Sequence, residues 1–278
     1  NSTAQDYKTS VKVRAWASGG NLASGRASIA GAGTQTAGLA FGGRIGPDAT
    51  VQNLSEEYNG TSWSEGNDLI TNRKLHTQVG TQNASLIIGG WNTLTNTEEY
   101  NGTNYATAAA LSQGGYAKIG FGVQNAAFST AGTESDSNGV RAESEQYDGA
   151  AWSNQVSMIN PRFYGGAGSV NAGITSYGFR AAPSATEAMN CTELWNGTSW
   201  SETVEAILTG EHGVEYGTQN AFVVTAGTGD TPHAVRKTTQ FFDGISYSMD
   251  ADLNYSAYWR SGANKAGQDA GLVFGGCY

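Results

Sequence analysis

The sequence is poor in the residues that most often carry chemistry. Its 278 residues include 2 cysteines, 3 histidines and 4 prolines. Two cysteines, Cys191 and Cys277, are too few for a disulfide framework or a zinc site, so we expect two free thiols. No apolar run reaches about 18 residues, the length that suggests a membrane-spanning helix, and we expect no membrane insertion.

Charge is also scarce, and acidic residues outnumber basic ones. Charged residues make up 14% of the chain, and the formal net charge is −9 at pH 7. An acidic body lacks the lysines and arginines that neutralise phosphates, which argues against a nucleic-acid partner. The chain begins at Asn1 without a methionine, as is typical of a processed chain or a fragment of a longer one.

Glycine and aromatic residues, by contrast, are plentiful. The chain has 39 glycines, and 10% of its residues are aromatic. Low charge with abundant glycine suits a β-rich chain with many turns. A helical protein would be richer in Glu, Lys and Leu, and a disordered chain would have fewer aromatic residues.

One short string recurs along the chain. Its first copy, residues 57–63, reads EYNGTSW, and further copies occupy residues 99–105, 146–152, 194–200 and 241–247. Asn-Gly or Asp-Gly between aromatic-flanked extended segments predicts a hairpin, with a type I′ turn that places both central residues at positive φ.

A second string recurs out of phase with the first. It is an apolar strand that ends in glycine, and its copies end at residues 43, 90, 132, 178, 227 and 276. Near-continuous apolar runs are typical of strands that are packed on both faces. The two recurrent strings therefore predict six buried strands and five hairpins.

The aromatic residues that close the repeats set the period. They are Trp16, Trp63, Tyr105, Trp152, Trp200 and Tyr247, at spacings of 47, 42, 47, 48 and 47 residues. The 31 residues after Tyr247 and the 16 that end at Trp16 together make 47, one repeat. A period of about 40–50 residues with four strands per unit predicts a β-propeller.

The sequence thus predicts an all-β fold, a single six-bladed propeller with four antiparallel strands per blade. The sixth blade would be closed by both ends of the chain together. The predicted blades are residues 17–63, 64–105, 106–152, 153–200, 201–247, and 248–278 plus 1–16.

The repeats resemble the kelch repeat, with Gly-Gly after an apolar strand, a later Tyr and a later Trp. The resemblance covers essentially the whole chain and is strongest in the first two complete units. Strings such as GTQTAGLAFGG and TEEYNGTSW are similar to the low-charge, kelch-like repeats of phage and environmental microbial proteins. That resemblance implies a virion-surface, tail-fibre or cell-surface component.

The strands of a blade are called a to d from the channel outward. The a–b and c–d turns are short and nearly uniform, whereas the b–c loops differ in length and sequence. The least repetitive loops are residues 44–55, 133–145, 179–191 and 228–240. Variation between repeats marks loops on one face, often the binding face.

The repeats predict that strand a opens with an arginine in four of the units: Arg26, Arg73, Arg162 and Arg260. Around the channel mouth they would bind carboxylate or sugar groups. Alternatively, each hydrogen-bonds carbonyls or carboxylates of a neighbouring blade. The candidate ligand-binding set is completed by Arg44, Trp91 and Arg180, and exposed aromatics such as Trp91, Tyr164, Tyr255 and Trp259 suit sugar or protein contacts.

Signals for an enzyme are weak. The three histidines, His76, His212 and His233, are scattered, and Glu211, His212 and Glu215 are the nearest approach to an acid–base cluster. We therefore expect no catalytic residues, no metal and no cofactor.

The sequence favours a non-catalytic recognition or structural module of a phage virion, tail fibre or microbial surface. Its partners would be a protein or glycan on a host or cell surface, or other virion or fibre subunits, and its location extracellular or on the virion. The alternative is a propeller enzyme, an oxidase or a glycan-active enzyme, with its site at the channel mouth.

Overall fold

The computed structural model describes residues 15–46, 50–134, 139–181, 186–210, 212–225, 227–228, 235–263 and 269–277. These residues form strands and connecting turns, and none of the described segments is an α-helix. No helix in this part of the chain is therefore long and apolar enough to cross a membrane.

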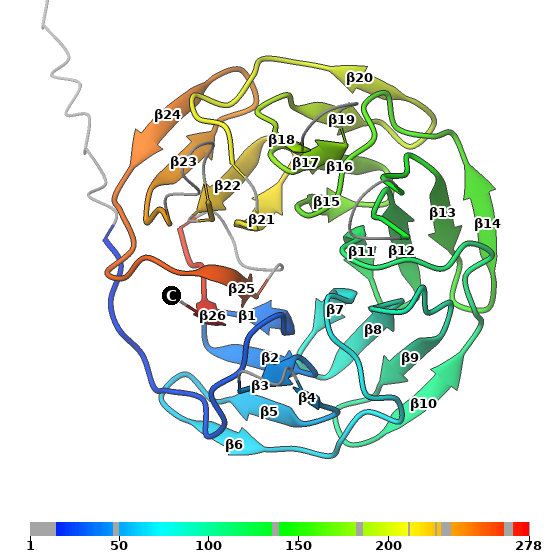
Figure 1. Cartoon of the computed structure of the whole chain (residues 1–278), viewed down its shortest axis with the longest axis vertical. Helices are drawn as coiled ribbons and strands as arrows, with labels where there is room; N and C mark the ends of the chain where they lie inside the picture. The colour runs from blue at the N-terminus through cyan, green and yellow to red at the C-terminus, as the bar shows by residue number, and fades with distance from the viewer. Residues whose placement is uncertain are drawn as a thin grey trace, which may run out of the picture.

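The strands fall into four sets by their distance from the centre (Figure 1). The innermost, a, are β1 (Ala30–Thr34), β7 (Thr77–Thr81), β11 (Ile119–Val123), β15 (Ala167–Ser169), β21 (Val214–Thr218) and β25 (Tyr258–Gly262). The b strands are β2 (Ala37–Phe41), β8 (Ala84–Ile88), β12 (Ala126–Thr130), β16 (Ala172–Thr175), β22 (Ala221–Thr225) and β26 (Val273–Cys277).

The outer strands complete five of the sheets. The c strands are β5 (Ser55–Tyr58), β9 (Thr97–Tyr100), β13 (Ser144–Tyr147), β19 (Glu193–Trp195) and β23 (Thr239–Phe242). The d strands are β6 (Trp63–Glu65), β10 (Tyr105–Ala108), β14 (Trp152–Gln155), β20 (Trp200–Glu202) and β24 (Tyr247–Asp250). Two b–c loops add small hairpins, β3 (Arg44–Ile45) with β4 (Thr50–Val51), and β17 (Phe179–Ala181) with β18 (Thr186–Ala188).

The arrangement is an all-β propeller, as the repeats predicted. Five sheets each contain four antiparallel strands, and β25 with β26 forms a two-stranded sheet in a sixth sector. Each a strand contacts the a strands on either side, and β25 lies between β21 and β1, so the ring is closed (Figure 1). The third strand expected in a sixth four-stranded blade falls within residues 1–14, which lie outside the described residues. At the position expected for the fourth strand, from Trp16 onward, the structure has no strand.

Contacts between the first and last parts of the described chain also close the ring. The N–H of Ser28 donates to the Trp259 carbonyl at 3.2 Å, and that of Gly276 to the Arg26 carbonyl at 3.1 Å. On the rim, the Trp16 indole N–H donates to the Ala251 carbonyl at 3.1 Å.

The Trp16 contact repeats a bond found inside two blades. Trp63 and Trp152 donate from Nε1 to the carbonyls of Gly20 and Ala109, 43 residues earlier in each case. Trp16 and Ala251 are 235 residues apart in a chain of 278, which is also 43 when counted through the two ends. Trp16 therefore occupies the closing position of the sixth sector.

The recurrent hairpin exists, but its turn differs from the predicted type I′. Tyr58 pairs with Trp63, which leaves four residues in the loop rather than two. Gly60 has the expected positive φ of 93°, but Asn59 does not adopt positive φ. Instead its Oδ1 accepts the N–H groups of Thr61 and Ser62 at 2.9 Å each, an Asx-type turn that stabilises the loop through the side chain.

Candidate functional site at the channel mouth

Six residues at the entrance to the inner strands share one unusual backbone conformation. One comes from each sector, and all are non-glycine residues with φ between 53° and 69°. We call them the channel ring: Ser28, Leu75, Ala117, Tyr164, His212 and Trp259, spaced by 47, 42, 47, 48 and 47 residues. Positive φ is costly for residues with a Cβ, so its sixfold repetition shows that the fold imposes it.

A belt of backbone hydrogen bonds explains this conformation. Four of the six ring residues donate their N–H to the carbonyl of the ring residue in the preceding sector: Leu75 to Ser28 at 3.1 Å, Ala117 to Leu75 at 2.6 Å, Tyr164 to Ala117 at 2.9 Å, and Ser28 to Trp259 at 3.2 Å. These bonds link neighbouring blades around the channel. The belt stabilises the ring whatever side chain each position carries.

The channel ring surrounds a cavity of about 110 Å³. All six ring residues line it, together with the first residues of the inner strands. The ring's side chains divide into two halves. Ser28, Leu75 and Ala117 are small or aliphatic, whereas Tyr164, His212 and Trp259 form what we call the aromatic arc.

The central ring of the aromatic arc, His212, contacts both of the others. Tyr164 and His212 have centroids 4.5 Å apart, and His212 meets Trp259 edge-on at 5.7 Å. The guanidinium of Arg44, from a b–c loop, lies 4.3 Å from the Trp259 ring centroid. All four side chains are partly exposed, so the arc is a surface of the molecule rather than a part of its core.

Three titratable groups with perturbed pKa values line the same cavity. Burial raises the pKa of Glu215 well above its usual value, although the Ser176 N–H and Arg162 partly offset this. Burial, then the positive charges of Arg73 and Arg26, lower the pKa of His76 well below 6.5. Burial lowers the pKa of Lys118 to about 8, and Glu145 partly offsets it.

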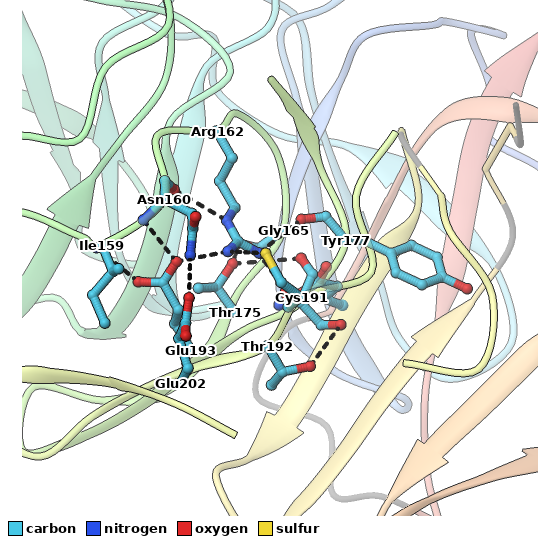
Figure 2. Close-up of polar contacts among 12 residues, drawn as sticks. Ile159, Asn160, Arg162, Gly165, Thr175, Tyr177, Cys191, Thr192, Glu193 and Glu202 are labelled. Atoms are coloured by element: carbon cyan, nitrogen blue, oxygen red, sulfur yellow. Dashed lines mark hydrogen bonds and ion pairs between the residues drawn. The ribbon is translucent and has the colours of Figure 1, made fainter. Parts of the chain in front are cut away.

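Three of the four predicted mouth arginines lie elsewhere. Arg26, Arg73 and Arg162 are at most 2% exposed, inside their blades. Their Nη2 atoms pair with Glu56, Glu98 and Glu193 of the c strands at 2.8, 2.5 and 2.7 Å. Figure 2 shows Arg162 also reaching the carbonyls of Tyr177 and Cys191 and the Cys191 sulfur. Buried, paired guanidiniums are closed to a ligand, which agrees with a structural role. Their partners lie in the same blade, however, and not in a neighbouring blade as the structural alternative expected.

The c-strand carboxylates also hold the preceding d–a loop. Glu193 accepts the N–H groups of Ile159 and Asn160 at 2.9 and 3.0 Å, as Figure 2 shows, and Glu56 and Glu98 make the equivalent bonds. In the fifth blade Gly210 replaces the arginine and the neutral Gln240 replaces the glutamate. Because both residues change together, the sequence itself indicates that the arginine and the glutamate pair in the other blades. The prediction that the arginines surround the channel mouth did not use this signal.

Arg260 was assigned to the wrong position. Arg26, Arg73 and Arg162 each lie two residues before the channel ring, whereas Arg260 follows Trp259 directly. The true equivalent in the sixth sector is Ala257. Arg260 does line the cavity, and its Nη2 donates to the Tyr255 carbonyl at 2.9 Å.

The other predicted binding residues are distributed over the face. Trp91 is partly exposed, packs on Tyr116 at 4.9 Å and lies beneath the Lys74 ammonium at 4.5 Å, outside the residues that line the cavity. Arg180 is exposed on β17, and Tyr255 is 63% exposed. The structure thus brings Arg44, Arg260, Tyr164 and Trp259 together.

The residues considered for catalysis are only partly described. Glu211, His233 and the Cys277 side chain lie outside the described residues. His212 belongs to the channel ring, and Cys191 is a partly buried free thiol whose pKa is raised by burial. Among described residues, no three His, Cys, Asp or Glu side chains gather as a metal site.

Fold and site together define a β-propeller with a cavity at its channel mouth. Among solved structures the chain is similar to that of YjhT, with a TM-score of 0.73, 11% sequence identity and 92% of each chain covered. At that identity the likeness shows the fold alone. No protein-family model and no curated protein matches the chain.

Proposed function

We propose that this protein is a non-catalytic recognition module that binds a protein or glycan through the channel-mouth face. The observation that carries the proposal is the aromatic arc. Tyr164, His212 and Trp259 present connected, partly exposed rings beside a cavity, with Arg44 against the outermost ring. Aromatic faces next to a cation suit both sugar rings and protein side chains.

The irregular b–c loops support the same face. Arg44 belongs to such a loop and touches the channel ring, so the variable loops and the cavity share one face. The resemblance of the repeats to kelch-like proteins of phage and environmental microbes supports an extracellular or virion-surface role, with host or cell-surface molecules or other fibre subunits as partners. A complete sixth blade belongs to this proposal, supported by Trp16 at the closing position.

A glycan and host-cell binding screen tests the proposal. We expect binding that the double variant Tyr164→Ala/Trp259→Ala reduces at least tenfold. Ile245→Ala is the matched control, because Ile245 is 78% exposed in a c–d turn on the opposite face. Binding that survives the double variant but depends on Ile245 would refute the assignment of the face.

One observation favours the alternative, an enzyme at the mouth. Glu215 and His76 have oppositely perturbed pKa values and line one cavity, as acid–base pairs often do. Substrate turnover that Glu215→Gln abolishes, in the absence of any glycan or protein binding, would favour it over the recognition role.

A further inference from the structure

The cavity beneath the aromatic arc has features of a ligand site in its own right. The cavity has a volume of about 110 Å³. Because about 10–15 Å³ of cavity volume is needed to hold one water, it has room for roughly seven to eleven waters. That is the volume of a small organic molecule or of one terminal group of a larger ligand.

One of the residues that line this cavity has a buried polar side chain without a partner. His76 is 7% exposed, and in the described part of the chain neither of its ring nitrogens has a hydrogen-bond partner. Leaving a buried polar group unpaired destabilises the folded protein, so such a group calls for an explanation. Its neighbours are the Phe41 ring, at 5.5 Å, and the Gly42 backbone, neither of which bonds to it.

The charge of the cavity is opposite to that of the protein. Lys118 and Arg260 line it, and the single carboxyl among the described lining residues is Glu215. Because burial raises the Glu215 pKa well above its usual value, this carboxyl holds its proton over a wider pH range and opposes the cations less. A protein of net charge −9 thus surrounds a cavity with cationic lining.

Lys118 retains donor capacity. It is 5% exposed, and within the described residues its Nζ donates to one acceptor, the Ala131 carbonyl, at 3.3 Å. An ammonium group has three donors. A carboxylate is an acceptor with two oxygens, so it suits both Lys118 and a His76 ring that donates from one nitrogen.

We propose that the channel cavity binds a small carboxylate-bearing molecule, or the carboxylate-bearing end of a longer ligand, through Lys118 and His76. This inference rests on the proposed recognition function and names the ligand chemistry at its centre. The aromatic arc then packs against the part of the ligand that projects from the cavity.

Glucuronate and glucose provide a matched pair of probes, because they share a sugar ring and differ in the carboxylate. We expect glucuronate to raise the melting temperature in a concentration-dependent way, and glucose at equal concentration to leave it unchanged. Calorimetric titration of Lys118→Met should give at least tenfold weaker glucuronate binding. Lys237→Met, at an exposed lysine on another part of the chain, is the control.

His76→Phe gives a second reading that does not depend on a lost charge. The phenyl ring preserves the packing against Phe41 and removes the two unpaired nitrogens, so we expect at least tenfold weaker binding with an unchanged or higher melting temperature.

Equal responses to glucose and glucuronate, or full binding by folded Lys118→Met and His76→Phe, would overturn the inference. Tighter binding of inorganic phosphate than of any carboxylate would overturn the choice of anion. If neither probe binds while glycan or cell binding still depends on Tyr164 and Trp259, this inference fails and the proposed function stands.

Discussion

The two halves of the channel ring share a backbone and differ in every side chain. Ser28, Leu75 and Ala117 have the same positive φ as Tyr164, His212 and Trp259, and the belt of hydrogen bonds runs through both halves. The comparison separates two roles. The backbone belt belongs to the fold, whereas the aromatic side chains of one half are not required by it and are available for recognition.

The buried arginines belong with the fold, and breaking one should give the largest effect. Arg162→Met leaves the Glu193 carboxylate buried without its cation, at a site where both side chains are 0% exposed. Loss of one partner of a buried pair costs about 3–5 kcal/mol. Urea unfolding measures it.

A compensating variant sharpens this result. Arg162→Met/Glu193→Gln imitates the fifth blade, which has Gly210 and Gln240, so it should recover much of the lost stability. A double variant no more stable than Arg162→Met would show that charge balance is not the reason for the pair.

Closure through Trp16 should have the next largest effect. Trp16 is half-buried against Val214, Tyr216 and Val223, and it bonds to Ala251. Trp16→Ala should cost about 2–3 kcal/mol, below the loss for a fully buried aromatic residue. Trp16→Phe should lose only about 1 kcal/mol for the hydrogen bond. Thermal unfolding that is unchanged by Trp16→Ala would contradict ring closure at this position.

The buried carboxyl of Glu215, which belongs to a residue lining the cavity, should make the free energy of unfolding depend on pH. Its pKa in the folded state is raised above the unfolded value of about 4.5, so its contribution to stability is fully present below that value and is lost as pH rises toward the folded pKa. Glu215→Gln should therefore stabilise the protein more at pH 8 than at pH 4. Denaturant unfolding at both pH values checks this, and equal effects at both would contradict a raised pKa.

The smallest effect is expected in the small half of the ring. Ala117→Gly relieves a left-handed conformation that costs about 1–2 kcal/mol for a residue with a Cβ, against about 0.5–1 kcal/mol for glycine's extra freedom when unfolded. A net gain of at most about 1.5 kcal/mol should appear in the unfolding midpoint. Ala126→Gly, in an ordinary strand conformation, should instead destabilise the protein. A loss above about 1 kcal/mol for Ala117→Gly would show that the methyl group matters more than the backbone.

The propeller could be predicted from the sequence because each repeat requires particular residue types at the same positions. Gly60 and its equivalents have φ of 90–96°, beyond the left-handed region of about 50–70° that residues with a Cβ can adopt, so these positions favour glycine. The aromatic residues that pair across the hairpin must fill the space between blades. Both demands leave residue types at a fixed period, from which the strands and the ring follow.

The channel ring was not predictable in the same way. Its positions share a backbone conformation but no residue type, because Ser, Leu, Ala, Tyr, His and Trp all occur there. Without a shared residue type to align the repeats, the repeat pattern equates Arg260 with Arg26. The true equivalent of Arg26 lies three residues earlier, at Ala257. The burial of Arg26 depends on the c-strand Glu56, 30 residues away, a long-range pairing that only the matched change in the fifth blade hints at.

The most direct test of the account compares the two halves of the ring in one binding measurement. Glycan and host-cell binding would be measured for the native protein, Tyr164→Ala/Trp259→Ala and Leu75→Ala, each confirmed as folded by its unfolding midpoint. The account predicts at least a tenfold loss for the aromatic double variant and native binding for Leu75→Ala. Equal binding by all three proteins would contradict the assignment of recognition to the aromatic arc.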